Sequence, residues 1–240
     1  GILHGANDLL ILAKGKNSKN FFLKNLLVYL TIIIACVLTY LFSSFIAILL
    51  FILLSSYHFG EEHLGDKIKV NRFFNVIFYL SYGIFLFSIL FYVSLAAVNE
   101  IMQELTGIIF TEAQIANTFI YLYVTKKTPI SVLFKEFFYL CLLSLVFKTS
   151  SLILGFAIYF IFWHSIPSLL NQVTFIYGDL TKESVKNYIK KAFIYWVISV
   201  FGLLILYKKI PEINLFSSII FVLLVAVTAP HTGVMFKMKN

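Results

Sequence analysis

Histidine is the residue type in this chain whose number and placement point most directly to chemistry. The 240 residues contain five histidines: His4, His58, His63, His164 and His231. All but His63 lie within or at the end of an apolar segment, beside a small or turn-forming residue. Neutral imidazole is the commonest metal ligand among side chains, and an ionisable side chain at membrane depth is costly enough to indicate function. We therefore predict that His4, His58, His164 and His231 meet at one metal site.

The ligand type narrows the choice of metal. A first-row metal bound by imidazoles alone, with open coordination positions, is iron(II), copper or zinc on ligand type. Cys36 and Cys141 lie within apolar runs, far apart in the sequence, and are typical of small buried hydrophobic residues. With no thiolate near the histidines, a non-haem iron site that binds O2 is compatible with this ligand set, beside copper and zinc.

His4 lies in the first segment, where Asp8 follows it by one helical turn. On a helix the two side chains share a face, so the Asp8 carboxylate can accept the second ring N–H of a ligating His4. The alternative is an exposed histidine and aspartate at a polar helix end. Residues 1–12 are too short to cross a membrane. Because the chain opens without methionine and shows no signal-peptide pattern, we expect this segment to end a helix whose beginning is missing.

His58 is followed by carboxylates at helical spacing. Glu61 and Glu62 stand three and four positions further on, so both share the face of His58 and are predicted to support it by hydrogen bonds. His63, five positions on, points about 140° away if the helix continues. We predict that His63 is a loop histidine or a hydrogen-bonding neighbour of the site. The alternative for Glu61, Glu62 and His63 is a solvated loop.

The composition of the chain indicates a membrane protein, so the histidines are expected to lie within a membrane. The chain is 60% hydrophobic and 12% charged, whereas soluble domains are about 25% charged. The net charge of +8 does not indicate nucleic-acid binding, because the lysines cluster between apolar runs and Arg72 is the only arginine. We predict one integral-membrane domain over residues 1–240.

The apolar runs predict the elements that carry the histidines. A spanning helix needs about 20 mostly apolar residues. One partial span over residues 1–12 is followed by seven complete spans, which begin at Leu26, Ser44, Phe73, Ile130, Ser151, Ala192 and Ile213. Residues 99–128 mix charged and apolar side chains, which predicts short amphipathic helices at the membrane interface. The fold class is therefore an all-α polytopic transmembrane bundle of about 7–8 helices.

The order of the spans sets a condition on the site. His58 ends the span that begins at Ser44, and His164 lies in the span over residues 151–170. Pro230 and His231 follow the last predicted span, residues 213–229. Residues 171–191 are predicted as a polar connection that includes an amphipathic turn or two. Simple alternation of spans puts His58 towards one membrane face and the other two histidines towards the opposite face. The imidazoles meet only if they lie well inside their helices or the span count is off by one.

Four short motifs, taken together and in order, resemble a known family. They are His-Gly-x-x-Asp at His4, Ser-x-x-His-Phe-Gly at His58, Phe-x-x-Trp-His-Ser at His164, and Pro-His at His231. This pattern is similar to that of the Brp/Blh family, the membrane-embedded β-carotene 15,15'-oxygenases of prokaryotes that supply retinal to rhodopsins. The resemblance covers essentially the whole chain, with similar spacing.

The resemblance implies an enzyme. Its activity would be oxygen-dependent central cleavage of β-carotene into two retinal molecules at a histidine-ligated, non-haem Fe(2+) in the prokaryotic cell (inner) membrane. A rhodopsin apoprotein would use the retinal, and His4, His58 and His164 would carry over as iron ligands. Many family members have a second histidine four positions after the Trp-His histidine, where this chain has Ser168. We therefore predict His231 as the fourth ligand, with His63 as the alternative.

The substrate would reach such a site from the lipid bilayer. β-Carotene is a long apolar polyene, and an aromatic tunnel in a dry cavity would receive it and exclude competing reactions. Five aromatic residues beside the histidines are the candidates for substrate binding: Trp163, Phe160, Tyr57, Phe59 and Tyr159. The alternative for each is packing or contact with lipid.

Other membrane metalloproteins and transporters are the rival interpretations. Di-iron desaturases and hydroxylases need about eight histidines in tight clusters, which five isolated histidines do not supply. A transporter or channel could use the histidines as ion ligands, but the sequence shows neither repeat symmetry nor paired broken helices. A haem held by two histidines would be recognised by its Soret absorption band.

Overall fold

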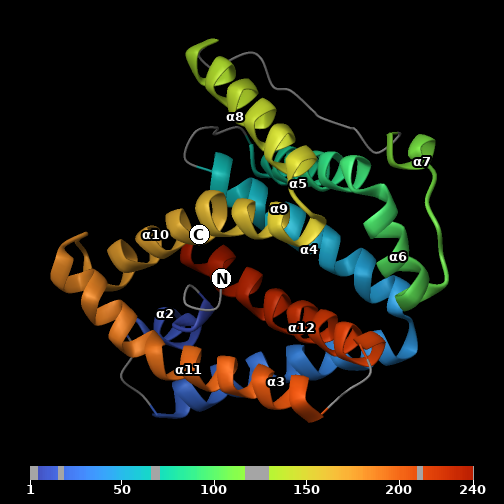
Figure 1. Cartoon of the computed structure of the whole chain (residues 1–240). Coiled ribbons are helices and arrows are strands. Elements are labelled where there is room, and N and C mark those ends of the chain that lie inside the picture. The colour runs from blue at the N-terminus through green and yellow to red at the C-terminus, as the bar shows by residue number, and fades with distance from the viewer. Residues whose placement is uncertain (1–4, 16–18, 66–70, 117–129, 210–212, 240) are drawn as a thin grey trace. The chain divides into compact units, whose positions relative to one another are not determined.

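The structure is a computed structural model that describes residues 5–15, 19–65, 71–116, 130–209 and 213–239. Within these residues the regular structure is helical and contains no strand (Figure 1). The helices are α2 Asp8–Ala13, α3 Lys19–Phe42, α4 Ser44–Leu64, α5 Arg72–Val93, α6 Leu95–Thr106, α7 Glu112–Ala116, α8 Ile130–Thr149, α9 Leu152–Ile158, the π-helix η1 Tyr159–Ser165, α10 Ile166–Tyr177, α11 Lys182–Lys209 and α12 Ile213–Lys239. The predicted all-α fold class is confirmed.

Six helical segments of the described chain are long and apolar enough to cross a membrane. They are Asn20–Phe42, Ser44–Leu64, Phe73–Val93, Leu152–Tyr177, Lys182–Lys209 and Phe221–Lys239. The chain is therefore a multi-pass integral membrane protein. Helix α8 forms where we predicted the span that begins at Ile130, but it is not among the six, so its crossing of the membrane stays a prediction.

The break predicted within the long apolar run after residue 26 is confirmed. Helix α3 ends at Phe42 and α4 begins at Ser44. The Ser43 hydroxyl between them accepts a hydrogen bond from the backbone N–H of Ile46, at 3.3 Å. Such a hydroxyl satisfies one of the N–H groups that a helix leaves without an internal partner at its start.

The connection predicted over residues 171–191 is much shorter than we expected, although a break between two helices does lie within it. Helix α10 continues to Tyr177 and α11 already begins at Lys182, so most of this segment is helical. Gly178 ends α10 with φ 86°, a left-handed conformation that suits glycine. The Thr181 hydroxyl then accepts the Ser184 N–H at 3.1 Å and starts α11. The polar side chains extend the ends of two spans instead of separating them.

We predicted that the last span ends before Pro230, and this prediction is wrong. Helix α12 runs from Ile213 through Pro230 to Lys239. Proline removes one N–H donor from a helix, but membrane helices tolerate it because neighbouring groups satisfy the freed carbonyl. His231 is therefore inside a helix and not at a span end. The alternation of spans had required the histidines to lie well inside their helices.

The chain forms two compact units, and the first contains residues 1–51 and 165–240. In this unit α12 packs along α3 and α2, and α10 packs against α2 and α11 (Figure 1). Ile11, Val234 and Met235 form a buried hydrophobic cluster between α2 and α12. The short helix α2 is thus held by the C-terminal helix of the chain.

The second unit contains residues 52–164, and α5 is its central helix. Helix α5 contacts α6, α7, α8 and α9. Two glycines allow α4 and α5 to approach closely: a Cβ at Gly60 would lie 2.0 Å from the Tyr79 carbonyl oxygen, and one at Gly83 would lie 2.1 Å from that of Ser56. Small residues at such a crossing are typical of helix packing in membranes. That both units belong to one domain over residues 1–240 stays a prediction.

Candidate metal centre

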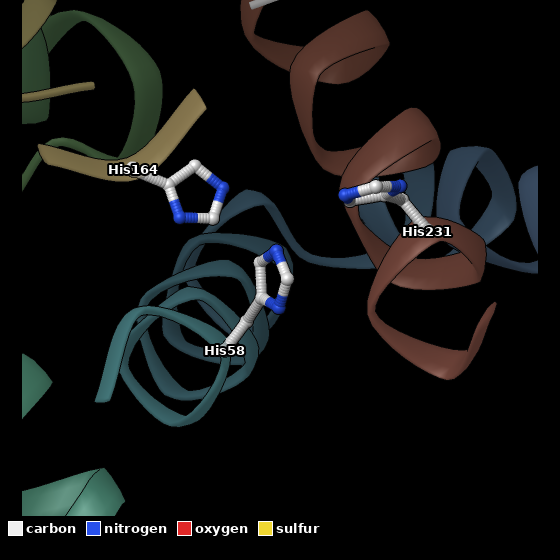
Figure 2. Close-up of side chains that lie close together, drawn as sticks. All are labelled: His58, His164 and His231. Carbon is white, nitrogen blue, oxygen red and sulfur yellow. The ribbon is translucent and has the colours of Figure 1, made fainter. Parts of the chain in front are cut away.

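Two of the predicted ligands lie side by side within the second unit. The ring centroids of His58, on α4, and His164, on η1, are 4.6 Å apart, and the rings are nearly perpendicular at 80° (Figure 2). His58 is 1% exposed and His164 is 2% exposed. Two imidazoles 106 positions apart in the sequence therefore meet in a buried, apolar environment.

The π-helical segment η1 sets the direction of His164. A π-helix has i→i+5 hydrogen bonds, is rare, and occurs often at functional sites. Pro167 follows at the start of α10 and has no N–H to give to the carbonyl of Trp163, four positions earlier. This missing donor disfavours regular α-helix across residues 163–167 and gives a local cause for the wider turn.

Aromatic rings surround the imidazole pair. Phe160 stacks on His164 with ring centroids 5.2 Å apart, and Phe59 lies 4.7 Å from the same ring. These two candidates for substrate binding are therefore next to the predicted ligands. Tyr159 is also buried, whereas Trp163 contacts Tyr139 at 6.4 Å.

Glu61 and Glu62, the polar neighbours predicted for His58, lie with it in helix α4. Helix α4 extends to Leu64, so the solvated loop over Glu61, Glu62 and His63 is wrong. Glu61 accepts a hydrogen bond of 2.7 Å from Tyr57, another of the candidate substrate residues. Support of His58 by Glu61 and Glu62 stays a prediction.

His63 belongs to a separate polar pair of the second unit. Its Nε2 lies 2.6 Å from a carboxylate oxygen of Glu136 on α8, and its ring stacks on Tyr82 with 7° between the planes. Both side chains are largely buried. The pair fixes α4 to α8, which gives His63 a structural role without a metal.

His231 is held within the first unit by the carboxylate of Asp8. The distance from His231 Nδ1 to Asp8 Oδ1 is 2.8 Å, and Asp8 Oδ2 accepts a hydrogen bond of 3.0 Å from the Tyr29 hydroxyl. His231 is 5% exposed and Asp8 is 2% exposed. We had predicted Asp8 as the partner of His4, which lies outside the described residues. Tyr29 was missed, because nothing in the local sequence of α3 links it to Asp8.

A buried polar network continues from this pair through the first unit. Asn7 donates to the backbone oxygen of Tyr188 at 3.2 Å, and the Tyr188 hydroxyl donates to Gln172 Oε1 at 2.5 Å. Gln172 Nε2 in turn lies 3.2 Å from the Ser168 hydroxyl and 3.4 Å from Met235 Sδ. Ser168 is therefore fully buried and hydrogen-bonded to a glutamine.

The donor set suits a divalent metal of the first transition row. A neutral imidazole that donates Nδ1–H to a carboxylate, as His231 does to Asp8, carries its lone pair on Nε2, the atom that binds a metal. His58, His164 and His231 are all buried. Neither cysteine is beside these histidines in the sequence, since Cys36 lies in α3 and Cys141 is exposed on α8.

Comparison with known proteins agrees with the motifs. The chain matches a family model described as Beta-carotene 15,15'-dioxygenase over residues 1–239. Neither a curated protein nor a solved structure matches the chain. The resemblance drawn from the four histidine motifs is thus confirmed over all but the last residue.

Proposed function

Since the chain belongs to the β-carotene 15,15'-dioxygenase family, we propose that it cleaves the central 15,15' double bond of β-carotene with O2 and releases two retinal molecules. The reaction takes place within the lipid bilayer, in the inner membrane of a prokaryotic cell. A rhodopsin apoprotein is the downstream user of the retinal. The observation that carries the proposal is the buried pair of imidazoles, His58 and His164, inside a membrane protein of this family.

The ligands we propose for the metal are His58, His164 and His231, with His4 as the fourth. The first three are buried, and each stands in one of the histidine motifs that carry the resemblance. His4 is included because its motif, His-Gly-x-x-Asp, opens the chain as the resemblance requires. His63 is not included, because its ring pairs with Glu136. Imidazole ligands without thiolates suit Fe(2+).

When bound, Fe(2+) supplies the redox chemistry that lets O2 react with a double bond. The protein residues supply the rest. Asp8 holds the tautomer and orientation of His231 through Nδ1. Phe59 and Phe160 cover the imidazole of His164, keep water away and offer flat apolar faces to a polyene.

The substrate arrives by partition into the membrane. β-Carotene has no polar groups, so a site within the bilayer receives it without passage through water. The helices around the imidazole pair expose large apolar side chains at their outer surfaces, such as Ile161 and Phe162 of η1. An enzyme of this composition needs no soluble carrier for its substrate.

Co-expression in a host that makes β-carotene tests the proposal. The wild-type chain should bleach the cells and produce retinal, and the purified protein should contain iron without a Soret band. His58→Ala and His164→Ala should lose retinal formation and iron while they still insert into the membrane. Matched controls are Leu50→Ala on α4 and Phe162→Leu on η1, both at exposed positions, and these should retain activity. Wild-type activity in either histidine variant would overturn the proposed site.

A further inference from the structure

Lysines gather at one end of the first unit. Helices α3 and α11 begin at this end, and α2, α10 and α12 end there. Lys14, which follows α2, donates a hydrogen bond to the carbonyl of Phe175 in the last turn of α10. Lys237, in the last turn of α12, lies 5.8 Å from the ring centre of Phe21 near the start of α3. These contacts bring the basic ends of the helices together.

The exposed charges at this end are mostly positive. Within the described residues, eight exposed lysines belong to it: Lys14, Lys24, Lys182, Lys186, Lys190, Lys191, Lys237 and Lys239. We call these eight residues the lysine face. Two exposed carboxylates, Asp179 and Glu183, lie in the same region, whereas the other end of α11 carries Lys208 and Lys209. The positive charge of the first unit is therefore concentrated at one end.

Helix α11 turns three of these lysines away from the protein. A buried stripe runs along its first turns at a spacing of four residues: Ser184, Tyr188 and Ala192. Lys182, Lys186 and Lys190 have the same spacing but are displaced by two positions, which is about 200° around a helix of 3.6 residues per turn. The three lysines therefore form a stripe opposite the buried one and point outwards.

The lysine face lies where membrane spans end. Four of the candidate spans begin or end at it: Asn20–Phe42, Leu152–Tyr177, Lys182–Lys209 and Phe221–Lys239. Lys191 lies 5.5 Å from the ring centre of Tyr177, the last residue of α10. Lysines beside aromatic rings at a span end are typical of the membrane–water interface. Leu180, in the turn between α10 and α11, is 53% exposed and offers an apolar side chain to lipid. The lysine face is thus at the depth of the lipid headgroups.

We propose that the lysine face binds the phosphate groups of anionic phospholipids, so that the protein selects these lipids from a mixed bilayer. Each lysine close to an anionic membrane surface strengthens the attraction roughly fivefold. The spans hold the lysine face in the plane of the headgroups, which makes a lipid phosphate its permanent neighbour and a soluble anion only a competitor. The inference does not depend on the histidines and goes beyond the cleavage reaction.

Spin-labelled lipids measure this selectivity. The full-length protein is reconstituted in phosphatidylcholine bilayers, and electron spin resonance gives the association of labelled phosphatidylglycerol relative to labelled phosphatidylcholine at the protein surface. The wild type should prefer phosphatidylglycerol about three- to tenfold at low salt. In 1 M NaCl, where the screening length is about 3 Å, the preference should fall below about twofold. A wild type without preference at low salt would overturn the proposal.

Two pairs of substitutions on α11 remove the same number of charges. Lys186→Gln with Lys190→Gln, in the lysine face, should lower the preference about twofold or more, whereas Lys208→Gln with Lys209→Gln, at the other end of the helix, should leave it unchanged. All four positions are exposed and glutamine favours helix, so both variants should fold. An equal loss in the two variants would show that net charge, and not the lysine face, attracts the lipid.

Two further measurements separate charge from structure and lipid from soluble phosphate. Lys186→Arg with Lys190→Arg keeps both charges and should keep the preference, and a loss there would contradict an electrostatic role. Inorganic phosphate should reduce the preference of the wild type no more than chloride does at equal ionic strength. If phosphate displaces phosphatidylglycerol beyond that, the lysine face binds a soluble anion and the proposal is wrong.

Discussion

Asp8 connects two helices that are far apart in the sequence. Its Oδ1 pairs with His231 of α12 and its Oδ2 accepts the hydroxyl of Tyr29 of α3. A buried carboxylate is costly unless it is paired and hydrogen-bonded, and here both oxygens have a partner. The pair of bonds fixes the ring of His231 and the tautomer that can bind a metal.

Replacement of Asp8 tests this role directly. In Asp8→Asn the amide cannot provide two acceptor oxygens, so the orientation of His231 is lost and the affinity for Fe(2+) should fall about 10- to 100-fold. Titration of the metal-free protein with Fe(2+) under anaerobic conditions measures the affinity. Asp179→Asn, at an exposed position after α10, is the control and should not change it. An unchanged affinity in Asp8→Asn would remove Asp8 from the site.

Sequence reasoning worked at the residue scale where the partner is local and failed where it is not. Phe160 was named only as a candidate for substrate binding, and its ring stacks on that of His164, four positions away along the chain. Asp8 was given to His4 by the same spacing rule. Its described partner stands 223 positions away, a distance at which no local pattern carries information.

At the scale of elements, the glycine at the crossing of α4 and α5 determines where His58 lies. Gly60 is two positions after His58, and any Cβ there meets the backbone of Tyr79. Backbone atoms cannot move aside as a flexible side chain can, so the helices would have to separate.

We predict that Gly60→Ala destabilises the protein by about 1–3 kcal/mol or more, because the crossing becomes overpacked. Gly202→Ala on α11 is the matched control, since a Cβ there meets nothing within 4 Å. That change should be neutral or stabilise by up to about 1 kcal/mol, as alanine favours helix. Thermal unfolding in detergent compares the two. Equal midpoints would contradict the close approach of α4 and α5.

The π-helical segment gives a second prediction at this scale. Deletion of Ile161 removes one residue from η1, restores the α-helical register and turns His164 by about 100° relative to α9. The variant should insert into the membrane but lose its metal. Ile161→Ala keeps the register and should retain it. The metal content of the two purified proteins tests this prediction. Metal retained after the deletion would show that η1 does not set the direction of His164.

Helix ends were the least predictable feature of the elements. The break at Ser43 was visible because two serines interrupt an apolar run that is too long for one span. Pro230 was read as a helix end by the rule for water-soluble helices, but α12 continues through it. Residues 182–191 were placed in a polar connection with an amphipathic turn or two, yet they continue without a break into the apolar part of α11. Polarity marks exposure to water here and not the end of a helix.

At the scale of the whole molecule, composition alone gave the class of protein. Helices α3 and α11 have large exposed apolar side chains along most of their length, for example Leu30, Leu38, Phe193 and Phe201. Such surfaces are stable only against lipid, since a soluble protein rarely exposes contiguous apolar area on this scale. Which segments the chain buries together could not be read from hydropathy, because lipid-facing and buried positions are equally apolar.

The crossing of α8 is a prediction that belongs to this scale. Cys141 is exposed on α8, so if this helix spans the bilayer the thiol faces lipid. In a variant with Cys36→Ser, a charged, membrane-impermeant maleimide should not label Cys141 in opened membrane vesicles but should label it after SDS is added. A cysteine introduced as Asp179→Cys in a chain without the other two should react in both conditions. Rapid labelling of Cys141 in vesicles would place α8 outside the membrane.

The contact between Asp8 and His231 also constrains biosynthesis. Ribosomes make the N-terminus first, so the carboxylate of Asp8 is produced more than 200 residues before its imidazole partner. Tyr29 is available early, but the second oxygen stays unmatched until α12 emerges. Helix α2 can pack against α3 early, but the buried polar core around Asp8 is complete only after the last segment has been translated.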